Sequence, residues 1–208
     1  MRASCVYAHE TEIEHLRNLV NKTSWSEKIS WHRWSKVQRG STAASFSDMD
    51  AIINAGFAGR LSNRLPSKTV VHVNQLVDPV SGKTVKLMSA CKFLGPTACF
   101  DDDSSPLQGR LLTVDKPVIK DTEKKILFDK YDADIVDMEA WDIFKLSKKL
   151  DIPFISFKLI SDNANENTTA TVTTDKHKLG HILGETLFDI FETLTKDFHG
   201  YFRNHTGI

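Results

Sequence analysis

The chain has 208 residues, of which 40% are hydrophobic and 26% are charged, and its 27 basic side chains balance 27 acidic ones. This is the composition of an ordinary globular protein, and zero net charge gives no electrostatic reason to expect nucleic acid or an anionic membrane as a partner. Three cysteines (Cys5, Cys91 and Cys99) are an odd number without zinc-like pairing, which favours a reducing compartment. No apolar run reaches the ~20 residues of a membrane span, and the N-terminus lacks the apolar core of a signal peptide. We therefore expect a cytoplasmic protein.

Apolar strands alternate with amphipathic helices along most of the chain. In chain order, the patterns predict a strand at 3–8 and a helix at 10–22, and then, within 49–61, a strand that runs into a glycine-bearing turn. Strands at 68–82 and 109–119, a helix at 122–131, a strand at 133–138 and a helix at 140–150 follow. The last predicted elements are a strand at 151–161, a polar segment at 162–174 and a final helix at 178–198. Residues 23–48 hold three of the four tryptophans and show no clear period.

This alternation predicts an α/β fold with three layers, in which a mixed, mostly parallel central sheet carries helices on both faces. The chain has no repeat and no Pro/Gly/Ser linker, so we expect a single domain over residues 1–208. Ligands of such folds bind beyond the carboxyl ends of the strands. The chemistry of the strand ends therefore decides where a site is expected.

Four predicted strand ends carry unusual polar or glycine content: "YAHETE", "INAGFAG", "IVDME" and "LISDNAN". They contribute Glu10 and Glu12, the backbone of residues 54–59, Glu139 and Asp162. Gly56 and Gly59 allow a tight turn and a close approach of backbone to ligand. Their spacing is that of neither a dinucleotide-binding nor a triphosphate-binding loop.

Each carboxylate also has a purely structural interpretation. Asp162 suits a helix N-cap or an Asx-turn, Glu139 suits the first turn of a helix, and Glu12 suits a solvated helix face. Asp137 is expected to point away from Met138 and to be structural, so we do not expect a catalytic dyad there. The small-residue turn and the three acids, taken together, predict one pocket.

Several segments resemble the nucleoside phosphorylase and nucleosidase superfamily, most closely the 5'-methylthioadenosine/S-adenosylhomocysteine nucleosidases. The similar segments are "AHETEIEHL", "INAGFAGRL", "VDMEAW" and "PFISFKLISDNAN". The resemblance implies hydrolysis of the N-glycosidic bond of a purine nucleoside, which releases free base and sugar. In this reaction Glu12 activates water, Met138 and Glu139 bind the ribose, and Asp162 protonates the leaving base.

The resemblance implies that the enzyme needs no cofactor and no metal, that its partner is a small nucleoside, and that it forms a homodimer. It also implies further substrate-binding residues, with His9 near the 5' substituent of the nucleoside. The remaining positions in this set are Phe57, Ala58, Gly59, Val118, Ile119 and Ser161.

Two alternatives stay open. Phosphorolysis is disfavoured because the first turn lacks glycine, and Asn54 and Phe57 replace the arginine and serine of phosphorylases, although Arg60 and Arg64 leave room for a displaced phosphate site. The second alternative is a relative that binds nucleosides without catalysis. It is suggested by the short segment after Glu12 and by Phe57 and Val118, which depart from the family pattern. Hopanoid-associated phosphorylase-like proteins and futalosine hydrolases share the same "DME…SD" frame.

Two further patterns have simple structural explanations. His177 and His181 are four residues apart on a predicted helix, but without a third ligand we expect a solvated pair and no metal site. The tryptophans at 25, 31 and 34 lie among basic residues, but in a neutral chain core or interface packing is the better explanation. The acidic run at 101–105 is expected to be a solvated loop.

Overall fold

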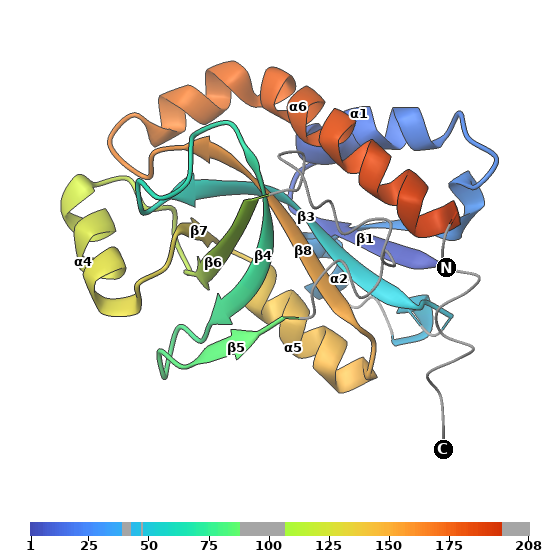
Figure 1. Ribbon diagram of the computed structural model, residues 1–208, viewed down its shortest axis with the longest axis horizontal. Coiled ribbons are helices and arrows are strands. Elements are labelled where there is room, and N and C mark those ends of the chain that lie inside the picture. The colour runs from blue at the N-terminus through green and yellow to red at the C-terminus, as the bar shows by residue number, and fades with distance from the viewer. Residues whose placement is uncertain (39–42, 47, 88–106, 197–208) are drawn as a thin grey trace.

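The computed structural model describes residues 1–38, 43–46, 48–87 and 107–196 (Figure 1). Cys91, Cys99 and the predicted loop at 101–105 lie outside these residues. The expectations of unpaired cysteines and of a solvated loop there therefore stay predictions. Within the part of the chain that is described, no helix is both long and apolar enough to cross a membrane.

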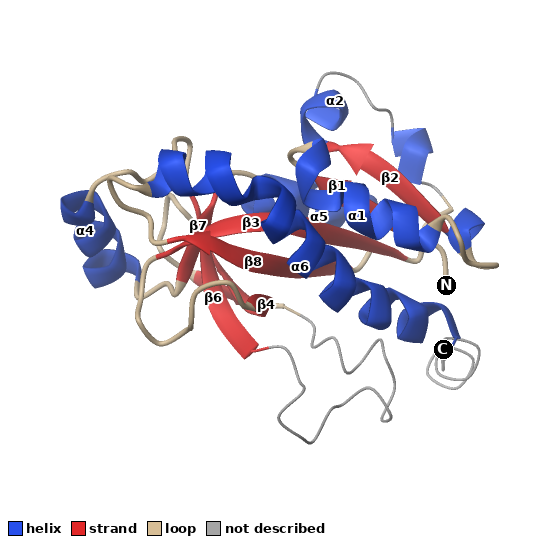
Figure 2. Ribbon diagram, turned by 90° about the horizontal axis from the view of Figure 1, so that it is seen from above, coloured by secondary structure: helices blue, strands red, loops and turns tan. Residues whose placement is uncertain are grey.

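The strands form one eight-stranded sheet. Its members are β1 (Ala3–Tyr7), β2 (Ile29–Arg33), β3 (Ala51–Arg60), β4 (Val70–Val77), β5 (Thr84–Lys86), β6 (Leu107–Thr113), β7 (Ile135–Asp137) and β8 (Phe154–Asp162). The order is β2-β1-β3-β7-β6-β4-β5, and β8 pairs with both β3 and β4. Strands β3, β8, β4, β6 and β7 therefore close into a small barrel, and β1 and β2 extend from it (Figure 2).

The strands run in two opposite directions. β1, β2, β3 and β8 are parallel to one another, as are β4, β6 and β7, and the two groups meet in antiparallel pairs at β3–β7 and β4–β8. The predicted α/β fold with a mixed sheet is confirmed. Most strand pairings are parallel, as expected, but the sheet is partly antiparallel and closes on itself, which the three-layer expectation did not include. Register shifts at Ala58/Gly59 and Val73/Gln75 accompany this curvature, as bulges do when strands bend.

The helices are α1 (Glu10–Val20), α2 (Trp34–Gln38), α4 (Asp121–Tyr131), α5 (Ala140–Leu150) and α6 (Thr168–Lys196), with short 3-10 turns at Ser26–Lys28 and Ala43–Phe46. Helices α1 and α6 pack side by side over one face of the sheet, and α5 lies on the other side (Figure 1). Helix α6 begins ten residues earlier than the apolar period predicts. Its first turns are polar and half-exposed because they border a cavity instead of the core.

The aperiodic region at 23–48 contributes an edge strand and core aromatics. β2 pairs in parallel with β1, and its half-buried side chains explain why it gives no clear alternation. Trp25 is buried next to Phe188, and Trp31 stacks on Phe191 with ring centroids 6.3 Å apart. The predicted packing role of these two tryptophans is therefore confirmed.

Candidate active site

A cavity of about 510 Å³ lies where β1, β3, β7 and β8 meet the start of α6. It brings together ten of the eleven predicted site residues: His9, Glu12, Phe57, Ala58, Gly59, Val118, Met138, Glu139, Ser161 and Asp162. Ile119 does not line the cavity, and its side chain is 44% exposed. An adjoining cavity of about 340 Å³ continues past His9 and Phe57 to Glu10 and Lys176.

Two glycines of β3 make room for two of the carboxylates. The predicted turn at 56–59 is wrong, because β3 continues through these residues to Arg60. The expected close approach at the glycines is present. A Cβ atom at Gly56 would lie 3.2 Å from Oε2 of Glu12, and one at Gly59 would lie 3.3 Å from Oδ1 of Asp162. The Gly-x-x-Gly spacing thus lets both acids lie directly against the strand backbone.

Glu12 is buried at the start of α1, so the expectation of a solvated face residue is wrong. Its Oε2 accepts hydrogen bonds from the backbone N–H groups of Ala8 (3.1 Å) and His9 (2.9 Å), and Oε1 accepts one from Phe57 (3.2 Å). A carboxylate offers about four lone-pair positions, so about one is left for another donor. Burial raises the pKa of Glu12 despite these hydrogen bonds and the nearby Lys158.

Glu139 shares a buried cation with Asp137. Lys158, in the middle of β8, is 0% exposed, and its Nζ lies 2.5 Å from Oε1 of Glu139 and 2.8 Å from Oδ2 of Asp137. Asp137 also accepts hydrogen bonds from Thr113 Oγ1 and from Ala140 N at the start of α5. Asp137 and Glu139 therefore meet at one ammonium group, and Asp137, Met138 and Glu139 all line the cavity. No described residue donates a hydrogen bond to the second oxygen of Glu139, Oε2.

One buried cation lies among several carboxylates in this cluster, and this arrangement decides the direction of the pKa shifts of Glu139 and Lys158. Burial, Asp137 and Glu12 together outweigh Lys158 and raise the pKa of Glu139 to about 7. The two carboxylates raise the pKa of Lys158 in spite of its burial, so the lysine stays protonated. Lys158 is not among the predicted site residues, although a single lysine inside the apolar run "FISFKLIS" is a signal for a buried, paired charge.

Asp162 is held at the end of β8 by an Asx-type turn, as its structural interpretation predicted. Its Oδ1 accepts hydrogen bonds from Ala164 N (2.8 Å) and Thr168 Oγ1 (2.7 Å). Its Oδ2 lies 2.6 Å from Oγ of Ser161, which in turn lies 3.2 Å from the carbonyl oxygen of Ala58. Asp162 also lines the cavity, so its carboxylate can form this turn and still contact a ligand.

The topology explains why these acids converge. β8 runs parallel to β3, so Asp162 ends beside Gly59. β7 runs antiparallel to β3 with Val136 opposite Gly59, so the residues that follow β7 return along β3 towards Phe57. Glu139 therefore lies near Glu12, and Asp162 lies at the other end of the same short stretch of β3.

The remaining walls are apolar on one side and cationic on another. Val114, Pro117, Val118 and Val136 line the cavity, and Val118 is buried. Arg33 and Trp34 also line it, and sequence reasoning missed them because residues 23–48 show no period. Arg60 and Arg64, the two arginines considered for a displaced phosphate site, do not line this cavity. Arg60 donates a hydrogen bond to the carbonyl oxygen of Leu65, and Arg64 pairs with Asp132 and Asp134. Among described residues, the group of side chains with metal-like spacing lies outside this cavity.

Comparisons with known proteins agree with this architecture. The model of the phosphorylase superfamily matches residues 35–196. No curated protein matches the chain in sequence. Among solved structures, the chain is similar to 5'-methylthioadenosine/S-adenosylhomocysteine nucleosidase from Streptococcus pneumoniae, with a TM-score of 0.78 and 18% identity over 93% of this chain and 100% of that one.

Two proteins from Helicobacter pylori are similar to the same degree. Its 5'-methylthioadenosine/S-adenosylhomocysteine nucleosidase gives a TM-score of 0.75 at 17% identity, over 92% of this chain and 98% of that one. A mutant of its futalosine hydrolase gives 0.77 at 16%, over 92% and 99%. These likenesses show the fold, and the family model covers most of the chain. The chain therefore belongs to the phosphorylase superfamily.

Proposed function

We propose that the protein hydrolyses the N-glycosidic bond of a purine nucleoside. The observation that carries this proposal is the convergence of Glu12, Glu139 and Asp162 in one cavity, each presented by a different element. Breaking this bond builds positive charge on the sugar and negative charge on the leaving base. A site for this reaction needs an acid that protonates the leaving purine, an anion near the sugar and a proton acceptor for the attacking water.

Asp162 is the proposed acid for the leaving base. Its Oδ1 accepts two hydrogen bonds, so Oδ2, which faces Ser161, is the oxygen proposed to transfer the proton. Ser161 Oγ also lies within hydrogen-bond distance of the carbonyl oxygen of Ala58, which fixes the serine beside Asp162. General acid catalysis requires Asp162 to deliver a proton as the base leaves.

Glu139 is the proposed ribose ligand, with Met138 beside it. Lys158 occupies Oε1, so Oε2 is left to accept hydrogen bonds from sugar hydroxyls. The buried acids around one lysine also favour the positive charge that develops on the sugar. Lys158 and Asp137 act as positioning residues in this arrangement.

Glu12 is the proposed base for the attacking water. Its remaining lone pair accepts one proton of the water as the oxygen bonds to C1' of the sugar. The bond between C1' and the base nitrogen breaks, and its electron pair leaves with the base, which takes the proton of Asp162. Proton exchange with solvent then returns Glu12 and Asp162 to their starting states. A raised pKa strengthens Glu12 as a base near neutral pH.

A methylthioadenosine-like or S-adenosylhomocysteine-like nucleoside is the proposed substrate. Val114, Pro117, Val118 and Val136 offer an apolar wall for a purine. The adjoining cavity beyond His9 offers space for a 5' substituent. We further propose a single domain over residues 1–208 that works in the cytoplasm as a homodimer.

Base release decides the proposal. Purified protein is incubated with adenosine, inosine, methylthioadenosine, S-adenosylhomocysteine and futalosine, each with and without phosphate, and free base is measured by chromatography. We expect phosphate-independent release, and we expect Glu12→Gln and Asp162→Asn to abolish it while circular dichroism stays unchanged. Absence of base release from every nucleoside in both buffers would falsify the proposal.

Phosphorolysis is the second candidate, and Arg33 is the observation that favours it. This cation lines both cavities close to Glu12, where a phosphate nucleophile would lie. A rate that rises with phosphate and falls in Arg33→Gln would select phosphorolysis. Ligand-induced thermal stabilisation without any turnover would instead identify a binding protein that has lost catalysis.

A further inference from the structure

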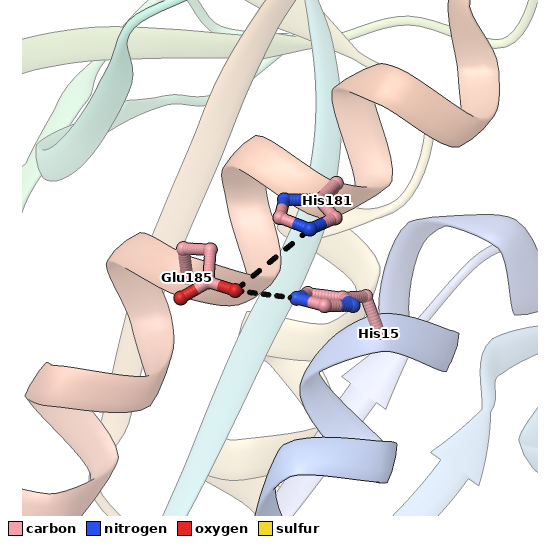
Figure 3. A group of neighbouring side chains, drawn as sticks. All are labelled: His15, His181 and Glu185. Atoms are coloured by element: carbon pink, nitrogen blue, oxygen red, sulfur yellow. Dashed lines mark hydrogen bonds and ion pairs between the residues drawn. The ribbon is translucent and has the colours of Figure 1, made fainter.

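Helices α1 and α6 carry a group of side chains with metal-ligand chemistry outside the cavity. His15 of α1, and His181 and Glu185 of α6, place one ligand atom each within 4.8 Å of one another (Figure 3). The sequence pairs His181 with His177, and that pairing lacks a third ligand. In the fold, His181 instead joins Glu185, one turn later, and His15 from the neighbouring helix supplies the third ligand.

The distances suit a small transition-metal ion. Nε2 of His15 lies 2.7 Å from Oε1 of Glu185, and Nε2 of His181 lies 3.9 Å from the same oxygen. A tetrahedral zinc ion with bonds of about 2.0–2.2 Å separates its ligand atoms by about 3.3 Å. The two measured distances lie on either side of this value, so modest side-chain rotations would allow all three atoms to bind one ion.

Both imidazoles present a ring nitrogen to Glu185, and rotation of one ring out of the stack lets both nitrogen lone pairs point at one ion. Their rings stack with centroids 3.8 Å apart and an angle of 21°, and both turn Nε2 towards Glu185 (Figure 3). Two imidazoles and one carboxylate form a ligand set that binds zinc and related ions and leaves a position open for water. Oxygen-seeking ions such as Mg²⁺ and Ca²⁺ are poorly matched to two nitrogen ligands.

The packing of the two helices fixes the backbone positions of these ligands. Gly180 and Gly184 of α6 lie against α1, and a Cβ atom at Gly184 would be 2.8 Å from Cδ2 of His15 and 2.9 Å from N of Leu16. A Cβ atom at Gly180 would collide with the carbonyl oxygen of Thr11. Because the helices touch at their backbones, His15 is held over His181 before any ion binds.

From this geometry we infer that His15, His181 and Glu185 form a binding site for a divalent transition metal of the zinc class. The bound ion links α1 to α6 and so stabilises the folded chain. Glu12 lies in the first turn of α1 and lines the cavity, so the ion stabilises the position of the helix that carries this acid. The inference does not depend on the proposed nucleosidase activity.

The test uses the full chain after treatment with EDTA and removal of the chelator. Zn²⁺ binding is measured by titration calorimetry, and the melting temperature Tm is measured with and without Zn²⁺. We expect saturable one-to-one binding and a rise of about 5 °C in Tm at saturating ion. His181→Ala or Glu185→Gln should weaken binding at least about tenfold and remove the Tm shift.

His177→Ala is the matched control. His177 is an exposed histidine of the same helix, four residues before His181, and it is outside the group. His199 and His205 lie outside the described residues and remain in every variant, so binding through them would survive His181→Ala. Equal Zn²⁺ affinity in wild type and His181→Ala, or equal loss in His177→Ala, would overturn the inference. Absence of Zn²⁺ binding to the wild-type chain would overturn it as well.

Discussion

Replacing Lys158 with methionine tests the buried charge cluster most directly. Methionine keeps an unbranched apolar stem but removes the ammonium group that lies 2.8 Å from Asp137 and 2.5 Å from Glu139. Two buried carboxylates are then left without their cation, and breaking a buried pair in this way typically costs about 3–5 kcal/mol. In a domain of 208 residues, 1 kcal/mol corresponds to roughly 2–4 °C, so Tm should fall by about 6–20 °C.

The loss should depend on pH with a definite sign. Lys158 lowers the pKa of Glu139, so without the ammonium group this pKa rises further, and the native state keeps a proton that the unfolded state releases. Stability then falls as pH rises, and the difference from wild type should be larger at pH 8 than at pH 5. Urea denaturation followed by circular dichroism at both pH values measures this.

Two variants serve as controls. Lys125→Met removes a cation that is 78% exposed and lies 3.4 Å from Asp129, and it should change the free energy of unfolding by less than about 0.5 kcal/mol. Lys158→Arg keeps the charge and should retain most of the stability. A loss below about 1 kcal/mol in Lys158→Met, or an equal loss at pH 5 and pH 8, would refute the reasoning.

Three further predictions concern the neighbouring groups. Gly56→Ala should displace Glu12 by a few tenths of an ångström and lower kcat about 10- to 100-fold in base-release assays, with little change in Tm; unchanged kcat would contradict the role of this contact. Thr168→Val removes a 2.7 Å hydrogen bond to Asp162 and should lower kcat about tenfold, whereas Thr186→Val, which loses only a bond within α6, should leave kcat unchanged. The free energy of unfolding should fall as pH rises from about 4.5 to about 7, because native Glu139 keeps its proton over this interval while the unfolded chain releases it. Urea titrations across this pH range measure the decline, and Glu139→Gln should flatten it.

Local sequence was sufficient to find most of the elements and most of the cavity's lining. The sequence predicts β8 correctly because it is a mostly apolar run whose residues are all buried, and it predicts α5 correctly because its apolar residues recur with the helical period. Ten predicted site residues line the cavity because most of them lie in or just after β1, β3, β7 and β8, which meet there. Local chemistry also gave the Asx-turn at Asp162, since a short carboxylate suits that geometry wherever a strand ends.

Longer-range features were decided by tertiary structure. The barrel-like closure depends on β8 pairing with two strands that run in opposite directions, and no local pattern encodes such a pairing. The burial of Glu12 follows from the bare backbone of Gly56 across the sheet, and the partners of Lys158 come from a strand and a helix start about twenty residues earlier. His15 reaches His181 only because two glycines let α1 and α6 touch. Sequence thus determined which chemical groups the chain carries at its strand ends, and tertiary structure decided their partners, because charge and burial depend on neighbours that are distant along the chain.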